Sequence, residues 1–324
     1  MSLTPRENFI RFFKNEPVEW MPSSQDLLRF NPDILIENIA RGGVNEARSY
    51  SIDQYGGKDM FGVPWIYCPN EGGSMEESGF ILMEDINDWP QVLKFPDLDA
   101  LDWEGCAQRN KEYLTTDKLI DSTVYSAFFE RLISFLGFEG AAMSMIDEDC
   151  EDAIRALFDK LSDLYIGIIE RLHKFFGVEH IYLHDDWGSQ QSTFFSVNTH
   201  KSLIVPYVKK VVDAAHAMGV FVEMHSCGRI GTLMPNLIST GIDSWRGQPK
   251  VNDKYALVQQ YGDQFKFGVE IVAPDQPISN DEAVAIAKEF VRQYAGTNIW
   301  LSLTRGFSQE QMDLMFRTIY QELG

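Results

Sequence analysis

The stretch Glu223-x-His225-x-Cys227 places three metal-ligating side chains at every second position of the chain. Alternate residues of an extended strand share one face, so we expect these three side chains to point to the same side. Imidazole and thiolate groups are good zinc ligands, and a carboxylate can supply the third ligand of a catalytic site. The spacing fits a zinc that binds a nucleophile or polarises a methyl-bearing heteroatom. It also fits a buried histidine hydrogen-bonded to a neighbour beside an inert core cysteine.

A second candidate is the carboxylate pair Asp185-Asp186, which follows the apolar run of residues 181–183. Such a run is typical of a buried strand, and the pair would lie at its polar tip. Adjacent strand residues point to opposite faces, so we expect one of the two carboxylates to enter a pocket. That carboxylate would act as a general acid or base, or hold a cationic substrate or a metal. The alternative is a helix cap or a salt bridge that orders a loop.

Further candidates are the polar and aromatic side chains that follow the predicted strands. Arg305 would bind a carboxylate or phosphate of the substrate, or else pair with Glu270. Glu270 is in addition a candidate third metal ligand. Tryptophans at these positions would wall an apolar pocket or belong to the core. The predicted substrate-binding residues are Gln190, Trp187, Arg246 and Arg305.

Between these candidates the chain alternates between helix and strand patterns. Apolar residues recur at helical spacing over 151–176, and Gly177 ends this predicted helix. Capping boxes at residues 279–282 and 308–311 begin the last two helices. Other helices are predicted at 200–218, around 233–237 and at 255–261, and other strands at 220–225, 242–245, 265–271 and 298–303.

These consecutive strand–helix units imply parallel strands joined by crossover helices. The order fits either a doubly wound sheet or a barrel, and no glycine-rich phosphate loop follows any predicted strand. In a (β/α) barrel the carboxyl ends of the strands form the active face, and the polar candidates above recur at those ends. We therefore predict an α/β fold, a (β/α)8 TIM barrel, with its active site at that face.

The first half of the chain has a less regular pattern. Residues 4–7 make a capping box for a helix to about Asn15, residues 20–24 fit a first strand, and residues 123–126 fit a strand before a helix at 128–136. Residues 50–105 are rich in Gly, Pro, Asp and aromatic residues, and are predicted to be a loop or hairpin excursion over one end of the barrel. Because the sequence has no linker pattern, residues 1–324 are expected to form a single barrel domain.

The charge balance restricts the kinds of partner. The 324 residues include 28 Lys and Arg against 48 Asp and Glu, a net charge of −20. Such a chain repels phosphate backbones and anionic membranes, so we expect neither a nucleic acid nor a membrane as partner. No apolar run approaches the length of a membrane helix, and the N-terminus lacks a signal-peptide pattern. The four cysteines lack the spacing of a disulfide framework, so a cytoplasmic location is expected.

The segment HDDWGSQQSTFFS, followed by VFVEMHSCGRIGTLMPNLISTGIDSW, resembles the uroporphyrinogen decarboxylase superfamily. More narrowly, it is similar to the methyltransferase branch, whose members move methyl groups to or from corrinoid proteins. The segments DMFGVPW at 59–65, DINDWPQVLKFPDLDALDW at 85–103 and GFEGAAMSMIDE at 137–148 extend the resemblance over most of the chain. Its strongest motif is the His-x-Cys-Gly at 225–228.

The resemblance implies a (β/α)8 barrel, in agreement with the element pattern. Decarboxylase members carry an arginine-rich motif of the type MRQAGRY, whereas this chain reads WMPSSQDLLRFNPD there, with Arg29 outside such a motif. Thiol-alkylating methyltransferases bind zinc through His-x-Cys and a second cysteine near the last strand. His225 and Cys227 match the first part, but no cysteine follows Cys227. A carboxylate such as Glu223 or Glu270 would then complete the zinc site.

The leading hypothesis is a methyltransferase that moves a methyl group between a small O-, N- or S-methyl donor and a corrinoid protein. Zinc would activate the donor, and Asp185 or Asp186 would orient or protonate it. The cobalamin would be carried by the partner protein. One alternative is a metal-independent decarboxylase or lyase in which Arg246 and Arg305 hold substrate carboxylates. Another is a non-catalytic barrel that only binds a ligand.

Overall fold

The computed structural model describes residues 2–70, 73–248 and 250–323, without the side chains of residues 303–305. The chain divides into two compact units. The terminal unit comprises Met1–Leu28, Asp117–Leu119 and Asp243–Gly324. The central unit comprises Arg29–Thr116 and Ile120–Ile242. The predicted site residues are distributed over both units.

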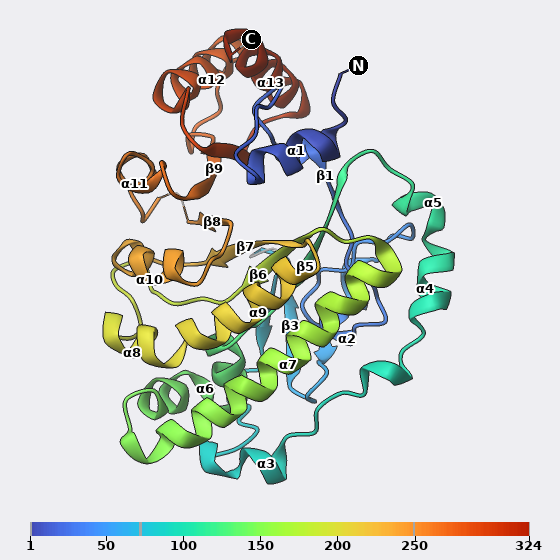
Figure 1. The fold of residues 1–324 in the computed structure, drawn as a ribbon, viewed down its shortest axis with the longest axis vertical. Coiled ribbons are helices and arrows are strands. Elements are labelled where there is room, and N and C mark those ends of the chain that lie inside the picture. Colours follow the sequence, from blue (N-terminus) through green and yellow to red (C-terminus); the bar gives the residue numbers. More distant parts are fainter. Residues whose placement is uncertain (1, 71–72, 249, 324) are drawn as a thin grey trace. The chain divides into compact units, whose positions relative to one another are not determined.

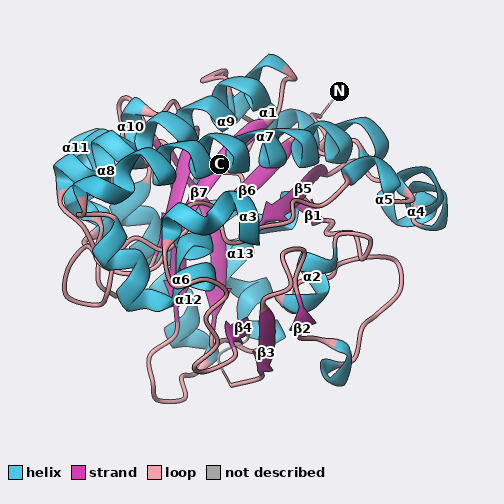
Figure 2. Ribbon diagram, turned by 90° about the horizontal axis from the view of Figure 1, so that it is seen from below, coloured by secondary structure: helices cyan, strands magenta, loops and turns pink. Residues whose placement is uncertain are grey.

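Parallel strands form the centre of the central unit, and their order in space follows their order in the sequence. β5 (Leu119–Val124) pairs with β6 (His180–His184), and β6 pairs with β7 (Phe221–Ser226). Figure 2 shows these three strands side by side. Their registers align the carboxyl ends, so the loops that follow them meet at one edge.

Helices connect these strands, as expected for parallel pairs. α6 (Phe129–Ser144) and α7 (Glu151–Phe176) connect β5 to β6, and α8 (Val197–Leu203) and α9 (Val205–Ala217) connect β6 to β7. α10 (Met234–Ser239) follows β7. α7 buries its apolar stripe and ends at Gly177, whose left-handed backbone caps the helix as predicted. It lies beside α9 (Figure 1). The prediction of one helix over 200–218 is wrong, because Pro206 cannot continue a helix from α8 and instead lies in the first turn of α9.

The N-terminal part of the central unit contains the predicted excursion. A three-stranded antiparallel sheet is formed by β2 (Gly57–Lys58), β3 (Pro64–Cys68) and β4 (Gly73–Glu76), so the predicted hairpin is present (Figure 2). The helices of this part are α2 (Ile36–Ala40), α3 (Trp89–Val92), α4 (Trp103–Arg109) and α5 (Lys111–Leu114). Short 3₁₀ helices of the chain lie at Ser24–Asp26, Ile52–Gln54, Ile86–Asp88, Leu98–Ala100, Glu148–Cys150 and Gly231–Leu233.

The terminal unit repeats the strand–helix alternation. β8 (Ser244–Gly247) pairs with β9 (Lys266–Val272), and β9 pairs with β10 (Ile299–Arg305), both in parallel. The helices are α1 (Pro5–Phe13), α11 (Lys254–Tyr261), α12 (Asn280–Tyr294) and α13 (Gln309–Leu323). The predicted capping boxes at Thr4–Glu7 and Ser279–Glu282 are both formed.

The first strand lies later in the chain than predicted. β1 spans Leu27–Arg29, whereas the prediction put it at residues 20–24. Ser23 makes a single parallel bridge to Leu301, and the chain then turns through a 3₁₀ helix. The cause is local turn chemistry, because the carboxylate of Asp26 accepts the backbone N–H of Ser23 at 2.7 Å.

In each unit parallel strands alternate with helices, and strands that follow one another in the sequence are neighbours. This arrangement confirms the predicted α/β class and the (β/α)-barrel type. Among the described residues, no helix combines the length and the apolar composition needed to cross a membrane.

Candidate active site

The ends of β6 and β7 bring the two sequence motifs together. His184 and His225 are opposite one another in the parallel register of these strands. Their imidazole rings are stacked, with centroids 4.6 Å apart and an interplanar angle of 26°. Because side chains alternate along a strand, Tyr182 and Glu223 share this face one layer deeper. The register therefore joins the His-Asp-Asp and His-Ser-Cys segments at one point.

Asp186 completes a group of metal-ligating side chains, which we call the His–Asp–His group. One ligand atom each from His184, Asp186 and His225 lies within 4.8 Å of the other two. The distance from His225 Nε2 to Asp186 Oδ1 is 4.0 Å. The side chains of His184, Asp186 and His225 are 18%, 27% and 14% exposed, so solvent can reach the group.

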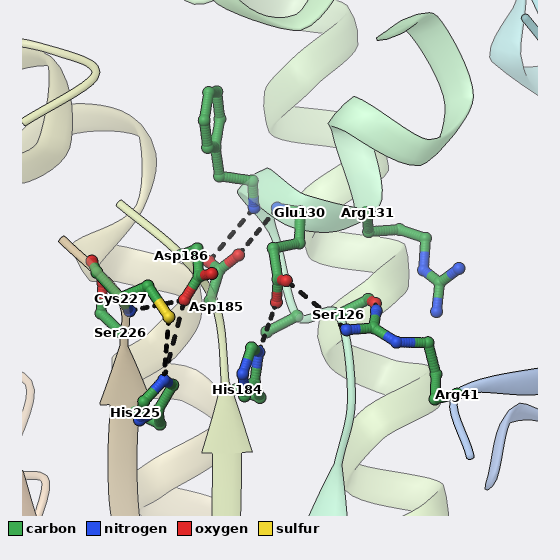
Figure 3. Close-up of polar contacts among 12 residues, drawn as sticks. Arg41, Ser126, Glu130, Arg131, His184, Asp185, Asp186, His225, Ser226 and Cys227 are labelled. Atoms are coloured by element: carbon green, nitrogen blue, oxygen red, sulfur yellow. Dashed lines mark hydrogen bonds and ion pairs between the residues drawn. The ribbon is translucent and has the colours of Figure 1, made fainter. Parts of the chain in front are cut away.

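Cys227 lies beside this group. Its Sγ is 3.3 Å from His225 Nε2, and its backbone N–H donates to Asp186 Oδ1 at 2.5 Å (Figure 3). The next residue, Gly228, packs against the backbone of Gly188 in the loop that follows β6. This contact fixes the two loops to one another and holds the thiol next to the carboxylate.

Asp185 has a different environment from Asp186. Its side chain is fully buried and accepts the backbone N–H groups of Phe129 and Glu130, at 3.1 and 2.8 Å. The indole N–H of Trp187 donates to the same carboxylate at 2.8 Å. Burial, together with the charge of Glu130, raises the pKa of Asp185 to about 7. Asp185 therefore caps the N-terminus of α6 and orders the loop after β6. This is the helix-cap alternative given above for the carboxylate pair.

Glu130, at the start of α6, contacts the His–Asp–His group from the other side. Its Oε2 is 2.7 Å from His184 Nδ1. Burial alone would raise the pKa of Glu130, but the charge and hydrogen bond of His184 lower it to about 2. Burial opposes the charged form of His184, yet Glu130 raises the pKa of this histidine. The two side chains therefore form a carboxylate–imidazole pair behind the candidate metal ligands.

Three other predicted site residues of the central unit lie outside the His–Asp–His group. Glu223 is fully buried on β7. Trp187 is also fully buried, and its ring centroid lies 4.4 Å from that of His200. Gln190 is exposed in the loop after β6. Their predicted roles as metal ligand or substrate contacts stay predictions.

The remaining predicted residues belong to the terminal unit. Arg246 is nearly buried on β8, and its guanidinium carbon lies 5.3 Å from the ring centroid of Trp300. Glu270 is half-buried on β9. The side chain of Arg305 lies outside the described residues. The roles proposed for these three residues also stay predictions.

A site role for His184 and Glu130 is not among the predictions from the sequence. His184 shares a strand face with Tyr182 and ends β6 beside His225. Counting alternate positions back from the tip would have marked it as inward-facing. Glu130 offers no comparable signal, because its contact with His184 joins residues of two different strand–helix units.

A second set of ligand-type atoms occurs elsewhere in the central unit, at Asp33, Glu46 and Cys106. These atoms are engaged by protein groups. Arg48 and Arg109 pair with the Asp33 carboxylate, and Glu46 accepts the backbone N–H of Asp33 at 2.7 Å. Burial raises the pKa of the Cys106 thiol to about 12. This set is consequently a neutralised structural network rather than a cation site.

The comparison with solved structures found a methyltransferase from Methanosarcina mazei, similar over 100% of both chains with a TM-score of 0.65 at 13% identity. An endo-1,4-beta-xylanase from Caldicellulosiruptor owensensis gives a TM-score of 0.37 at 10% identity, over 69% of this chain and 77% of the other. An intracellular xylanase from Thermoanaerobacterium saccharolyticum gives 0.40 at 10% identity, over 68% and 76%. The full-length similarity to the methyltransferase supports the fold described above.

Comparisons of the sequence itself added no relative. No family model matches the chain, and no curated protein matches it.

Proposed function

We propose that this protein is a methyltransferase that moves a methyl group between a small methylated donor and a corrinoid protein, assisted by zinc. The observation that carries the proposal is the His–Asp–His group with Cys227 beside it at the carboxyl ends of β6 and β7. This is the face where (β/α) barrels place their active sites. The full-length similarity to the Methanosarcina mazei methyltransferase supports the reaction class.

The donor set fits zinc. Two imidazoles, a carboxylate and a thiol are the ligand types that zinc takes in proteins, at bond lengths of about 2.0–2.3 Å. In a tetrahedral site such bonds put ligand atoms about 3.3–3.8 Å apart. The observed 3.3 Å from His225 Nε2 to Cys227 Sγ and 4.0 Å to Asp186 Oδ1 are close to this range. We assign His184, Asp186, His225 and Cys227 as the residues that would hold the zinc, and the methyl donor would reach the ion as an added or exchanged ligand.

Zinc bound there would act as a Lewis acid on the donor's oxygen, nitrogen or sulfur. That heteroatom keeps the electron pair of its bond to the methyl carbon when the methyl group leaves for the cobalt of the partner. The chain's own residues bind and orient the donor at the exposed side of the His–Asp–His group. Asp186 is the carboxylate that we assign to this site, because both oxygens of Asp185 accept protein N–H groups.

The first test is the metal content of the purified protein. We expect near-stoichiometric zinc by elemental analysis after purification without chelators and with zinc re-supplied. His225→Ala and Cys227→Ser should both lose metal, whereas His216→Ala, at an exposed position on α9, should keep it. A wild-type protein without metal under these conditions would contradict the zinc mechanism.

The second test is the reaction. The protein is mixed with cob(I)alamin and a panel of methyl ethers, methylamines and methyl thioethers, and methylcobalamin formation is followed by absorbance. Carbon dioxide release from carboxylated compounds, insensitive to chelators, would favour the decarboxylase alternative. Absence of methyl transfer across the panel, with a corrinoid protein as well as with cob(I)alamin, would contradict the proposed function.

A further inference from the structure

The hydrogen bond between His184 and Glu130 restricts the imidazole to one tautomer. An ionised carboxylate can only accept hydrogen bonds, and Glu130 Oε2 lies 2.7 Å from His184 Nδ1. Nδ1 must therefore carry the hydrogen that is donated. In the neutral ring this leaves the lone pair on Nε2, the only other nitrogen able to bind a metal.

Glu130 is in turn held by Arg41, which follows α2. A guanidinium nitrogen of Arg41 lies 3.7 Å from Glu130 Oε1, and the other donates to Ser126 Oγ (Figure 3). The guanidinium lies over the ring of Trp65, with its carbon 4.2 Å from the ring centroid. Ser126 is buried and has a φ of 51°, a conformation that costs energy for a residue with a β-carbon. Strain of this kind is typical of functional sites.

A second ion pair fixes α2 against α6, and in this pair the acidic residue is on α2 and the basic residue on α6. Glu37 lies one helical turn before Arg41, and Arg131 follows Glu130 directly. Arg131 is fully buried and contacts Glu37 Oε1 and Asp59 Oδ2 at 2.6 Å each. A shift of α2 by one turn would place like charges together, so the two pairs define one alignment of the helices. Glu130 is thereby held in place beside His184.

We propose that Glu130 is a positioning residue that holds His184 as the Nδ1–H tautomer, which leaves Nε2 as the nitrogen that would bind metal together with Asp186 and His225, and that Arg41 holds Glu130 in place for this task. The functional meaning of this inference rests on the proposed zinc site. The tautomer itself does not depend on metal being bound. Carboxylates that orient metal-binding histidines in this way typically change metal affinity by about 10–100-fold.

The test compares Glu130→Gln with the wild-type chain. The amide that this substitution introduces can donate to Nδ1 or accept from it, so it no longer restricts the ring to one tautomer. We label histidine with ¹⁵N, identify His184 through His184→Gln, and record ring ¹⁵N shifts along a pH series that extends until the ring has become neutral. The neutral wild type should show hydrogen on Nδ1, and Glu130→Gln should increase the population with hydrogen on Nε2. Zinc affinity, measured by chelator competition, should fall about 10–100-fold in the variant.

Four further variants separate positioning from a general loss of structure. Glu139→Gln removes an exposed carboxylate of α6, beyond the kink at Gly137, and should change neither readout. Glu130→Asp keeps a group that can only accept hydrogen bonds and should preserve the tautomer. Arg41→Met should weaken zinc binding, and Arg41→Lys should restore part of it. If Glu130→Gln does not fold, Glu130→Asp and the Arg41 pair carry the test.

The outcomes distinguish this inference from the proposed function. Hydrogen on Nε2 of His184 in the wild type, or an unchanged tautomer and zinc affinity in Glu130→Gln, would overturn the positioning role while leaving methyl transfer open. A wild-type protein that binds no zinc but switches tautomer in Glu130→Gln would support positioning and contradict the zinc mechanism.

Discussion

Gly228 lies so close to Gly188 that a β-carbon on Gly228 would stand 2.1 Å from the carbonyl oxygen of Gly188. The two glycines come from the loops after β7 and β6, and Gly228 has a φ of 81°. Only glycine satisfies both the backbone conformation and the close approach. The final residue of the His-x-Cys-Gly motif thus has a structural function. It lets the loop after β7, which carries Cys227, approach the loop after β6, which carries Asp186.

Gly228→Ala should destabilise the protein by about 2–5 kcal/mol, from the left-handed backbone and from the clash with Gly188. Zinc binding should fall as well, because the loop would carry Cys227 away from Asp186. The matched control is Gly219→Ala, where φ is 78° and no atom lies within 4 Å of the added carbon. This control should cost only about 1–2 kcal/mol. Chemical denaturation measures both, and equal losses would argue against the loop contact.

Asp185→Asn and Asp186→Asn should affect different properties, the first the stability of the fold and the second the affinity for zinc. Asp185→Asn replaces one of the two oxygens that accept protein N–H groups by an amide nitrogen that can only donate, and should cost about 1–3 kcal/mol of stability, with the metal retained. Asp186→Asn should change stability little and should lose zinc affinity. Denaturation curves and chelator competition on the same preparations separate the two roles. Loss of metal in Asp185→Asn, at unchanged stability, would refute this assignment.

Arg131→Met should be strongly destabilising. It would leave the buried carboxylates of Glu37 and Asp59 without their cation, which costs about 3–5 kcal/mol. Combining it with Glu37→Gln and Asp59→Asn should recover part of the loss, because the uncompensated charges are removed. Arg292→Met, which breaks a fully exposed pair with Glu289, is the control and should not measurably change stability. A small effect of Arg131→Met would show that water reaches this triad.

His200 should make the stability of the fold dependent on pH. It is fully buried between Trp187 and Phe195, and burial lowers its pKa from 6.5 to about 3. Between these pH values the unfolded chain binds a proton that the folded chain does not, so stability falls as pH falls. The slope contributed by one such group is about 1.4 kcal/mol per pH unit. This contribution of His200 to the slope of stability with pH should be present below pH 6.5 and absent above about pH 7.

His200→Gln should remove this part of the slope. Urea denaturation of both proteins between about pH 4 and pH 8 measures it as the difference between the two stability curves. Parallel curves over the whole range would mean that His200 is protonated in the folded protein.

Periodic patterns predicted the elements whose stability is local. The apolar spacing of residues 151–176 and the glycine at 177 gave α7 with its correct ends, and the two capping boxes at Thr4 and Ser279 gave the starts of α1 and α12. The predictions failed where a single side chain decides the backbone. Pro206 divides a continuous apolar pattern into α8 and α9, and Asp26 turns the chain before β1.

The candidate site was predictable only where its residues are neighbours in the sequence. His225, Cys227 and Asp186 are predictable because their types and spacing suggest chemistry at the ends of two predicted strands. The contribution of Glu130 and Arg41 depends on how α2 packs on α6 and on the register of β6 with β7. Those relations arise from tertiary packing, which no local pattern encodes.

The spread of the site along the chain has a consequence for folding. Arg41, Glu130, His184 and Cys227 are separated by most of the length of the central unit, so loops of that size must close before the site exists. Contacts of such long sequence separation form slowly. An ion held by His184, Asp186 and His225 would bind only the completed fold, so raising its concentration would lower the population of locally opened molecules.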